Sequence, residues 1–159
     1  MMGSNSSSAW AVAGFATALL VAIVVAAFGF LSLLADLEPV GDPAAGILVG
    51  PATVAGSVGA FLLLAGTGLT RGLRTWSLAG LALLATWAGG ILAGTIAYAA
   101  STGTVLAAFL FALAFMTVGF GAIIPVAAAL VAVLASATVR AQRGGVERPR
   151  WPWERDDDL

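Results

Sequence analysis

Four long stretches of this sequence contain no Asp, Glu, Lys or Arg, and this feature restricts the possible folds more than any other. The stretches are residues 10–34, 47–69, 76–100 and 104–139. A helix needs about 20 consecutive, mostly apolar residues to cross roughly 30 Å of hydrocarbon. Each stretch meets this length, and none alternates apolar and polar residues as a membrane β-barrel strand does. The sequence therefore predicts an all-α, four-helix transmembrane bundle over residues 10–139.

The composition excludes several other classes of protein. Of the 159 residues, 60% are hydrophobic and only 9% are charged, whereas soluble domains contain about 25% charged residues. The absence of Cys excludes disulfides and thiol chemistry. The absence of His removes the commonest metal ligand and the usual proton shuttle near neutral pH. A net charge of −1 gives no basic excess for binding nucleic acid.

The apolar stretches also lack the groups that membrane catalysis and ion transport use. Ionisable side chains inside a membrane usually mark proton relays, ion pathways and substrate sites, and the four stretches contain none. A hydroxyl nucleophile would need a neighbouring base, and acid–base chemistry has only loop and tail carboxylates to use. We therefore expect a protein that is not an enzyme and binds no cofactor or metal.

The fourth stretch is longer than one membrane crossing. As a single helix, residues 104–139 would extend for about 54 Å. One possibility is a long helix that is kinked near Pro125, because proline donates no hydrogen bond and clashes with the carbonyl of Gly121. The other is a chain that turns back near residues 119–121 and makes five spans. The distribution of arginine favours the first possibility.

Every basic residue is an arginine, and the arginines follow the second and fourth stretches. Arg71 and Arg74 occupy the loop after the second stretch, whereas the loop after the first contains three acidic residues and no arginine. Cytoplasmic loops are enriched in Lys and Arg. Four spans place all arginines on one side, so we expect both termini in the cytoplasm. Residues 1–9 are then a polar N-terminal segment, and residues 140–159 form a charged, disordered cytoplasmic tail.

Small residues recur at helical spacing within the stretches. Helices in lipid associate through such residues because their backbones can approach closely. Two patterns of the form GxxxG stand out, at Gly46–Gly50 and at Gly90–Gly94. The predicted helix-packing residues are Gly46, Gly50, Thr53, Ser57, Gly90, Gly94 and Gly121.

A single tryptophan, Trp87, lies near the middle of the third stretch. An indole N–H at this depth should have a hydrogen-bonding partner. One interpretation is a bulky residue that faces lipid or fills a groove between helices. The other is a contact for a lipid or a quinone.

The C-terminal tail combines basic and aromatic residues. One interpretation is an anchor whose basic part meets anionic lipid. The other is a docking peptide, since Pro149 and Pro152 form a P-x-x-P pattern. The candidate contact residues are Arg140, Arg143, Arg148, Arg150, Trp151 and Trp153.

The bias toward Ala, Gly and Arg, the four plain spans and the R-P-R-W-P-W-E sequence at residues 148–154 resemble small uncharacterised integral membrane proteins of high-GC Gram-positive bacteria. The resemblance implies a bacterial cell membrane and no family of known function. We expect the partners to be the lipid bilayer and other membrane proteins or a second copy. A scaffold or accessory subunit of a membrane complex is the leading interpretation, and an oligomeric channel or carrier for small neutral solutes or lipids is the alternative.

Overall fold

The computed structural model describes residues 3–35, 46–118 and 120–143, and within them the chain is all-α. Its elements are α1 (Gly3–Ala35), α2 (Val49–Thr70), α3 (Thr75–Thr102), α4 (Val105–Thr117), the short 3-10 helix η1 (Phe120–Ala122) and α5 (Ile123–Arg143). Four of these helices are long and apolar enough to cross a membrane. The prediction of an all-α protein with four long apolar helices is confirmed. Helix α1 begins at Gly3 and so includes most of the predicted polar segment 1–9.

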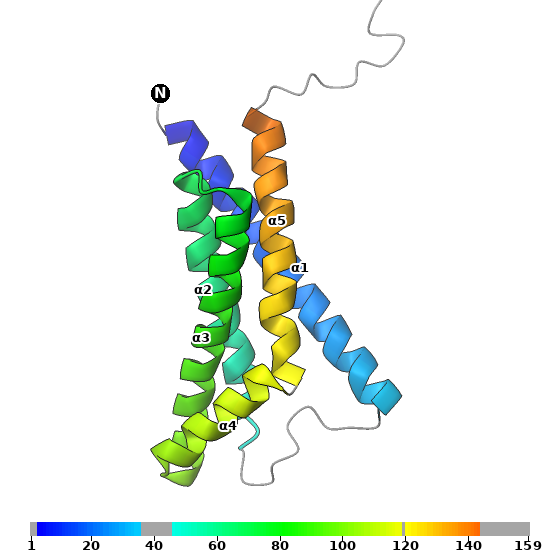
Figure 1. Cartoon of the computed structure of the whole chain (residues 1–159), viewed down its shortest axis with the longest axis vertical. Coiled ribbons are helices and arrows are strands. Elements are labelled where there is room, and N and C mark those ends of the chain that lie inside the picture. The colour runs from blue at the N-terminus through cyan, green and yellow to red at the C-terminus, as the bar shows by residue number, and fades with distance from the viewer. Residues whose placement is uncertain (1–2, 36–45, 119, 144–159) are drawn as a thin grey trace, which may run out of the picture.

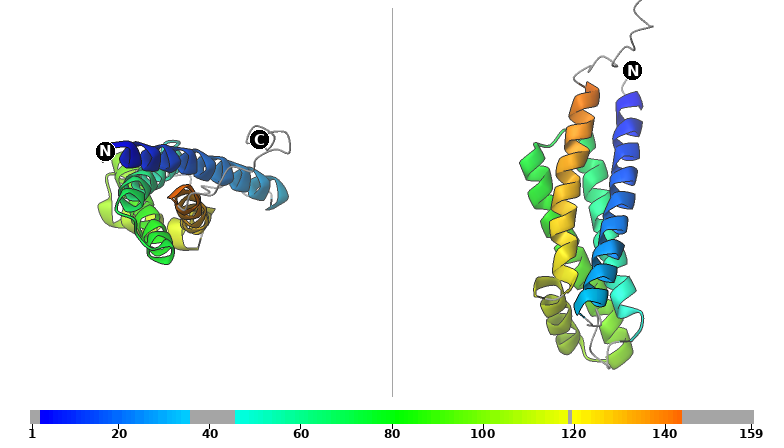
Figure 2. Two further views of the ribbon diagram at one scale, coloured as in Figure 1. Left: turned by 90° about the horizontal axis from the view of Figure 1, so that it is seen from above. Right: turned by 90° about the vertical axis from the view of Figure 1, so that its right-hand side faces the viewer.

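The four long helices form a bundle in which each packs mainly against two of the others, and the shorter α4 packs against α3 (Figures 1 and 2). Helix α3 lies between α2 and α5, and α1 lies on the other side of the same two helices. The largest fully buried side chains come from α1, α2, α3, α4 and α5, and include Leu20, Phe61, Leu78, Met116 and Ile124. The interior of the bundle is therefore a packed apolar core.

The turn between α2 and α3 follows from one glycine. Gly72 has a φ of 67°, which glycine adopts without steric cost. The N–H of Gly72 donates to the carbonyl of Leu69, and the N–H of Leu73 donates to the carbonyl of Gly68. These two bonds form a Schellman motif, which satisfies carbonyls at the end of α2. Helix α3 therefore runs back along α2.

The fourth apolar stretch forms two helices, so the prediction of one long helix over residues 104–139 is wrong. Helix α4 ends at Thr117, and α5 begins only after η1. The break therefore precedes Pro125, the third residue of α5. A proline is tolerated there because the first N–H groups of a helix have no partner within it. Charge gives no boundary within this run of 36 uncharged residues, but the break falls where the five-span alternative placed its turn, near residues 119–121.

The chain does not turn back as an antiparallel hairpin at this break. Helices α4 and α5 each pack against α3, and they contact each other mainly through η1. Figure 1 shows α4 rising from the end of α3 and α5 continuing in the same general direction. With 13 residues, α4 is shorter than one crossing. The alternative with five spans therefore receives no support from the packing.

Four arginines lie at one end of the bundle. Arg71 and Arg74 flank the α2–α3 turn, and Arg140 and Arg143 belong to the last turn of α5. Helix α1 begins at the same end (Figure 1). We call this the arginine end; the α3–α4 turn at Gly103 lies at the opposite end.

Helix α1 packs against the bundle over only part of its length. Its buried residues run from Ala9 to Val24, and they contact α2 and α5. Beyond Val24 the helix diverges from the bundle, as Figure 1 shows. One ring contact bridges the widening gap, between Phe28 and Phe120, whose centroids are 6.0 Å apart.

Candidate functional site

Helices α2 and α3 approach closely at a pair of glycines, Gly56 and Gly89. A Cβ atom on Gly56 would lie 2.6 Å from the carbonyl oxygen of Gly89, and one on Gly89 would lie 2.8 Å from the carbonyl oxygen of Gly56. Rotating a side chain cannot relieve these contacts, because both obstacles are backbone atoms. The two glycines therefore set the distance between α2 and α3.

The predicted packing residues of α2 and α3 lie beside this glycine pair. A Cβ atom on Gly90 would lie 2.5 Å from the Ser57 hydroxyl oxygen, and one on Gly94 would lie 2.7 Å from the Thr53 hydroxyl oxygen. Helix α4 completes the contact, since the same positions also approach Met116 and Ala112. The structure thus brings Thr53, Ser57, Gly90 and Gly94 together.

Sequence reasoning missed Gly56 and Gly89. The signal was present, because each glycine lies between two alanines at intervals of four residues. These patterns are Ala52–Gly56–Ala60 in α2 and Ala85–Gly89–Ala93 in α3. Small residues at this spacing allow helix backbones to approach. The predicted packing residues Ser57 and Gly90 each lie one position after these two glycines.

The other predicted packing glycines lie apart from this cluster. A Cβ atom on Gly46 would lie 3.4 Å from the Cβ of Ser101, near the opposite end. Gly50 is half-buried in α2. Gly121 is buried at the break between α4 and α5, where an added Cβ would meet Phe115 and Met116.

Only part of the predicted tail site falls within the described structure. Arg140 is exposed in the last turn of α5, and Arg143 is the final residue of that helix. The remaining tail candidates, Arg148, Arg150, Trp151 and Trp153, lie outside the described residues.

The buried hydroxyl groups mostly bond to their own helices. Thr53 Oγ1 donates to the carbonyl of Val49, and Thr86 Oγ1 donates to the carbonyl of Ala82, both at 2.7 Å. Such bonds satisfy a hydroxyl without a partner on another helix. Ser57 differs, because its buried Oγ has no hydrogen-bonding partner. Its hydroxyl lies against Gly90 of α3.

The described residues offer little chemistry beyond these hydroxyls. Across residues 3–35, 46–118 and 120–143, arginine is the one side-chain type that carries charge. No group of three or more His, Cys, Asp or Glu that could hold a metal occurs in that part of the chain.

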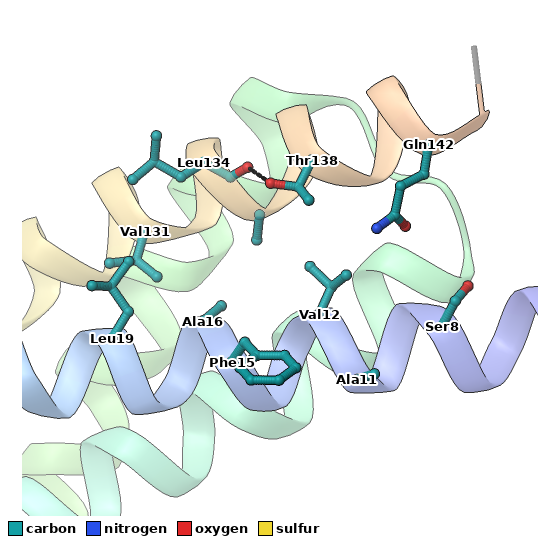
Figure 3. Close-up of a pocket in the computed structure, with 11 residues that line it drawn as sticks. Ser8, Ala11, Val12, Phe15, Ala16, Leu19, Val131, Leu134, Thr138 and Gln142 are labelled. Carbon is teal, nitrogen blue, oxygen red and sulfur yellow. Dashed lines mark hydrogen bonds between the residues drawn. The ribbon is translucent and has the colours of Figure 1, made fainter. Parts of the chain in front are cut away.

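A groove separates α1 from α5 near the arginine end (Figure 3). Its volume is about 440 Å³, within the usual range for ligand sites. Val12 and Gln142 point into the gap from opposite helices (Figure 3). The lining residues are Ser8, Ala11, Val12, Phe15, Ala16, Leu19, Val131, Leu134, Ala135, Thr138 and Gln142.

Trp87 lines a smaller groove of about 280 Å³ between α3 and α4. The indole is half-buried, and Thr95, Phe109 and Leu113 line the same groove. This position agrees with a bulky residue that partly fills a groove between helices. The lipid or quinone contact stays a prediction.

Comparison with known proteins places the chain in a family. The comparisons with curated proteins and with solved structures found no match. A family model described as a family of unknown function (DUF6121) matches residues 2–159. The expectation that the chain has no family of known function is thereby confirmed. With nearly its whole length matched, the chain belongs to the DUF6121 family.

Proposed function

We propose that this protein is a non-catalytic, multi-pass protein of the bacterial cell membrane that acts as a scaffold or accessory subunit of a membrane complex. The arginine end faces the cytoplasm in this proposal, because short cytoplasmic loops are enriched in arginine. Helix α1 begins at that end and α5 ends there, so both termini are cytoplasmic.

The observation that carries the proposal is the uncovered outer half of α1. Its apolar side chains remain largely exposed where the helix leaves the bundle, with Phe30 at 68%, Leu33 at 84% and Leu34 at 82%. A helix that diverges from its own bundle offers apolar surface on several sides to a helix of another membrane protein. Packing between membrane helices depends on such lateral contact.

The packed interior favours a scaffold over a channel within one subunit. The core of the described bundle is filled by large side chains such as Phe61, Leu20 and Met116, each at most 1% exposed. Each of the described grooves is lined by a pair of neighbouring helices, α1 with α5 or α3 with α4, and not by residues from all the long helices. The alternative, a channel or carrier for small neutral solutes or lipids, would therefore need a path between subunits of an oligomer.

Site-specific photo-crosslinking in native membranes tests the scaffold. A photo-reactive residue at Leu33 should cross-link to a different polypeptide, and the same residue at Ile96 should not. Ile96 is a matched control, because its side chain is 62% exposed and it lies toward the C-terminal end of α3, at the end of the bundle away from the arginines. The scaffold would be contradicted if Leu33 cross-linked only to further copies of this chain and the purified oligomer accelerated solute flux in liposomes. That result would support the carrier function instead.

A further inference from the structure

The groove between α1 and α5 changes in polarity along its length. Ser8, Thr138 and Gln142 line it near the arginine end, and apolar side chains line it from there to Leu19 and Val131 (Figure 3). We propose that this groove binds one phospholipid, with its headgroup at the arginine end and an acyl chain along the apolar part. This proposal is independent of the scaffold function.

The space for an acyl chain comes from small residues on the facing helices. Ala11 and Ala16 on α1 and Ala135 on α5 line the groove, and methyl groups do not fill the gap between two helix backbones. Ala16 and Ala135 also belong to the buried core, so the groove lies directly against the bundle. A lipid there would contact the two helices at once, unlike a lipid on a convex helix surface.

The length of the groove matches one leaflet of a bilayer. From Gln142 to Val131, α5 rises about 16 Å at 1.5 Å per residue. This rise is about half of the roughly 30 Å hydrocarbon thickness. A second groove of about 400 Å³ begins one helical turn beyond Leu19 on α1, at Ile23, and next to Val131 on α5, at Leu130, and its lining is wholly apolar. The first groove therefore fits a lipid of the leaflet on the arginine side.

The polar end of the groove fits a phosphate group. The Thr138 hydroxyl donates to the carbonyl of Leu134 at 3.0 Å, so its hydrogen is already used. Gln142 is exposed, and its side chain makes no hydrogen bond to another described residue, which leaves the two amide hydrogens for a phosphate oxygen. Arg71, Arg74 and Arg140 lie exposed at the same end and create a positive potential there. These charges favour an anionic phospholipid over a zwitterionic one.

Native mass spectrometry of the full-length chain in mild detergent tests the proposal. The detergent-purified protein receives equal amounts of phosphatidylglycerol and phosphatidylethanolamine. The wild-type chain should retain one phospholipid and prefer phosphatidylglycerol at least threefold. Ala11→Phe, which places an aromatic ring in the groove, should reduce this retention at least fivefold. Ala55→Phe is the control, because Ala55 is exposed on α2 and lines no described groove.

A second variant keeps the test decisive if a bulky residue at Ala11 disturbs the α1–α5 contact. Gln142→Leu changes an exposed side chain in the last turn of α5, and should lower the retention of phosphatidylglycerol at least threefold while the thermal midpoint stays unchanged. Equal lipid retention in the wild type, Ala11→Phe and Gln142→Leu would overturn the proposal. A lipid-free dimer that Ala11→Phe dissociates would also overturn it, since a second copy would then occupy the groove.

Discussion

Gly56→Ala should destabilise the bundle by about 3 kcal/mol, at the upper end of the usual cost of overpacking. The added methyl group would lie 2.6 Å from the carbonyl oxygen of Gly89 and would also overlap the Cβ of Ala93. Only a displacement of α2 from α3 relieves a clash with backbone. The size of the effect is the change in the free energy of unfolding. It is measured by titrating the protein in mixed micelles with a denaturing detergent and following its helical circular dichroism.

Gly59 provides a control on the same helix. A Cβ atom on Gly59 would have nothing within 4 Å, and alanine is a better helix former than glycine by about 1 kcal/mol in water. Gly59→Ala should therefore leave the free energy of unfolding unchanged or raise it. Equal effects of Gly56→Ala and Gly59→Ala would show that α2 and α3 do not meet at Gly56.

Phe61→Ala should cost about 3–5 kcal/mol, the range observed when a buried aromatic side chain is truncated. Phe61 is fully buried and is the largest such side chain in the described core. Its removal leaves a cavity among neighbours that lose their packing contacts. The same mixed-micelle titration measures the loss.

An exposed phenylalanine should respond very differently. Phe30 is 68% exposed on the outer half of α1, so much of its ring makes no packing contact within the folded protein. Phe30→Ala should change the free energy of unfolding by less than about 1 kcal/mol, as surface substitutions usually do. A loss at Phe30 as large as that at Phe61 would mean that α1 packs against the bundle along its whole length.

The long helices were predictable because charged residues bound the apolar stretches and each stretch is long enough for a membrane-spanning helix. Arg71 ends the second apolar stretch and Arg140 ends the fourth, and helices end within a few residues of both. The break between α4 and α5 was not predictable in the same way. Charge gives no boundary between residues 104 and 139, and glycine is frequent throughout the chain. The glycines near residues 119–121 indicated where a break could fall, but the choice between a kinked helix, a broken helix and a turn depended on how α4 and α5 pack against α3.

The divergence of α1 also depends on tertiary contacts. Helix α1 has apolar residues on every face. The sequence therefore does not indicate which face packs or where packing stops. The structure shows a buried side from Ala9 to Val24 and none described beyond it. The groove beside α5 lies along the packed part of α1, from Ser8 to Leu19. Its lining could not be assembled from sequence, because it comes from two helices whose relative placement depends on packing.

The small residues of α2 and α3 were predicted as packing residues, without a prediction of which helices meet. In the structure Thr53 and Ser57 of α2 lie beside Gly90 and Gly94 of α3. The glycines that meet through their backbones, Gly56 and Gly89, are each adjacent in sequence to a predicted residue. Neighbouring positions on a helix point about 100° apart, and several small-residue stripes exist on each helix. Sequence alone does not rank these stripes, whereas the approach of two backbones does.

Labelling of introduced cysteines tests most directly whether these helices cross a membrane with the arginine end inside. The chain has no cysteine of its own, so single variants at exposed Thr70, Leu84 and Ser101 report from the arginine end, the middle of α3 and the opposite end. In intact cells a membrane-impermeant maleimide should label Ser101→Cys alone, and Thr70→Cys should react only after the membrane is opened. Labelling of Leu84→Cys in intact cells as fast as Ser101→Cys, or labelling of Thr70→Cys but not Ser101→Cys, would contradict the proposed threading.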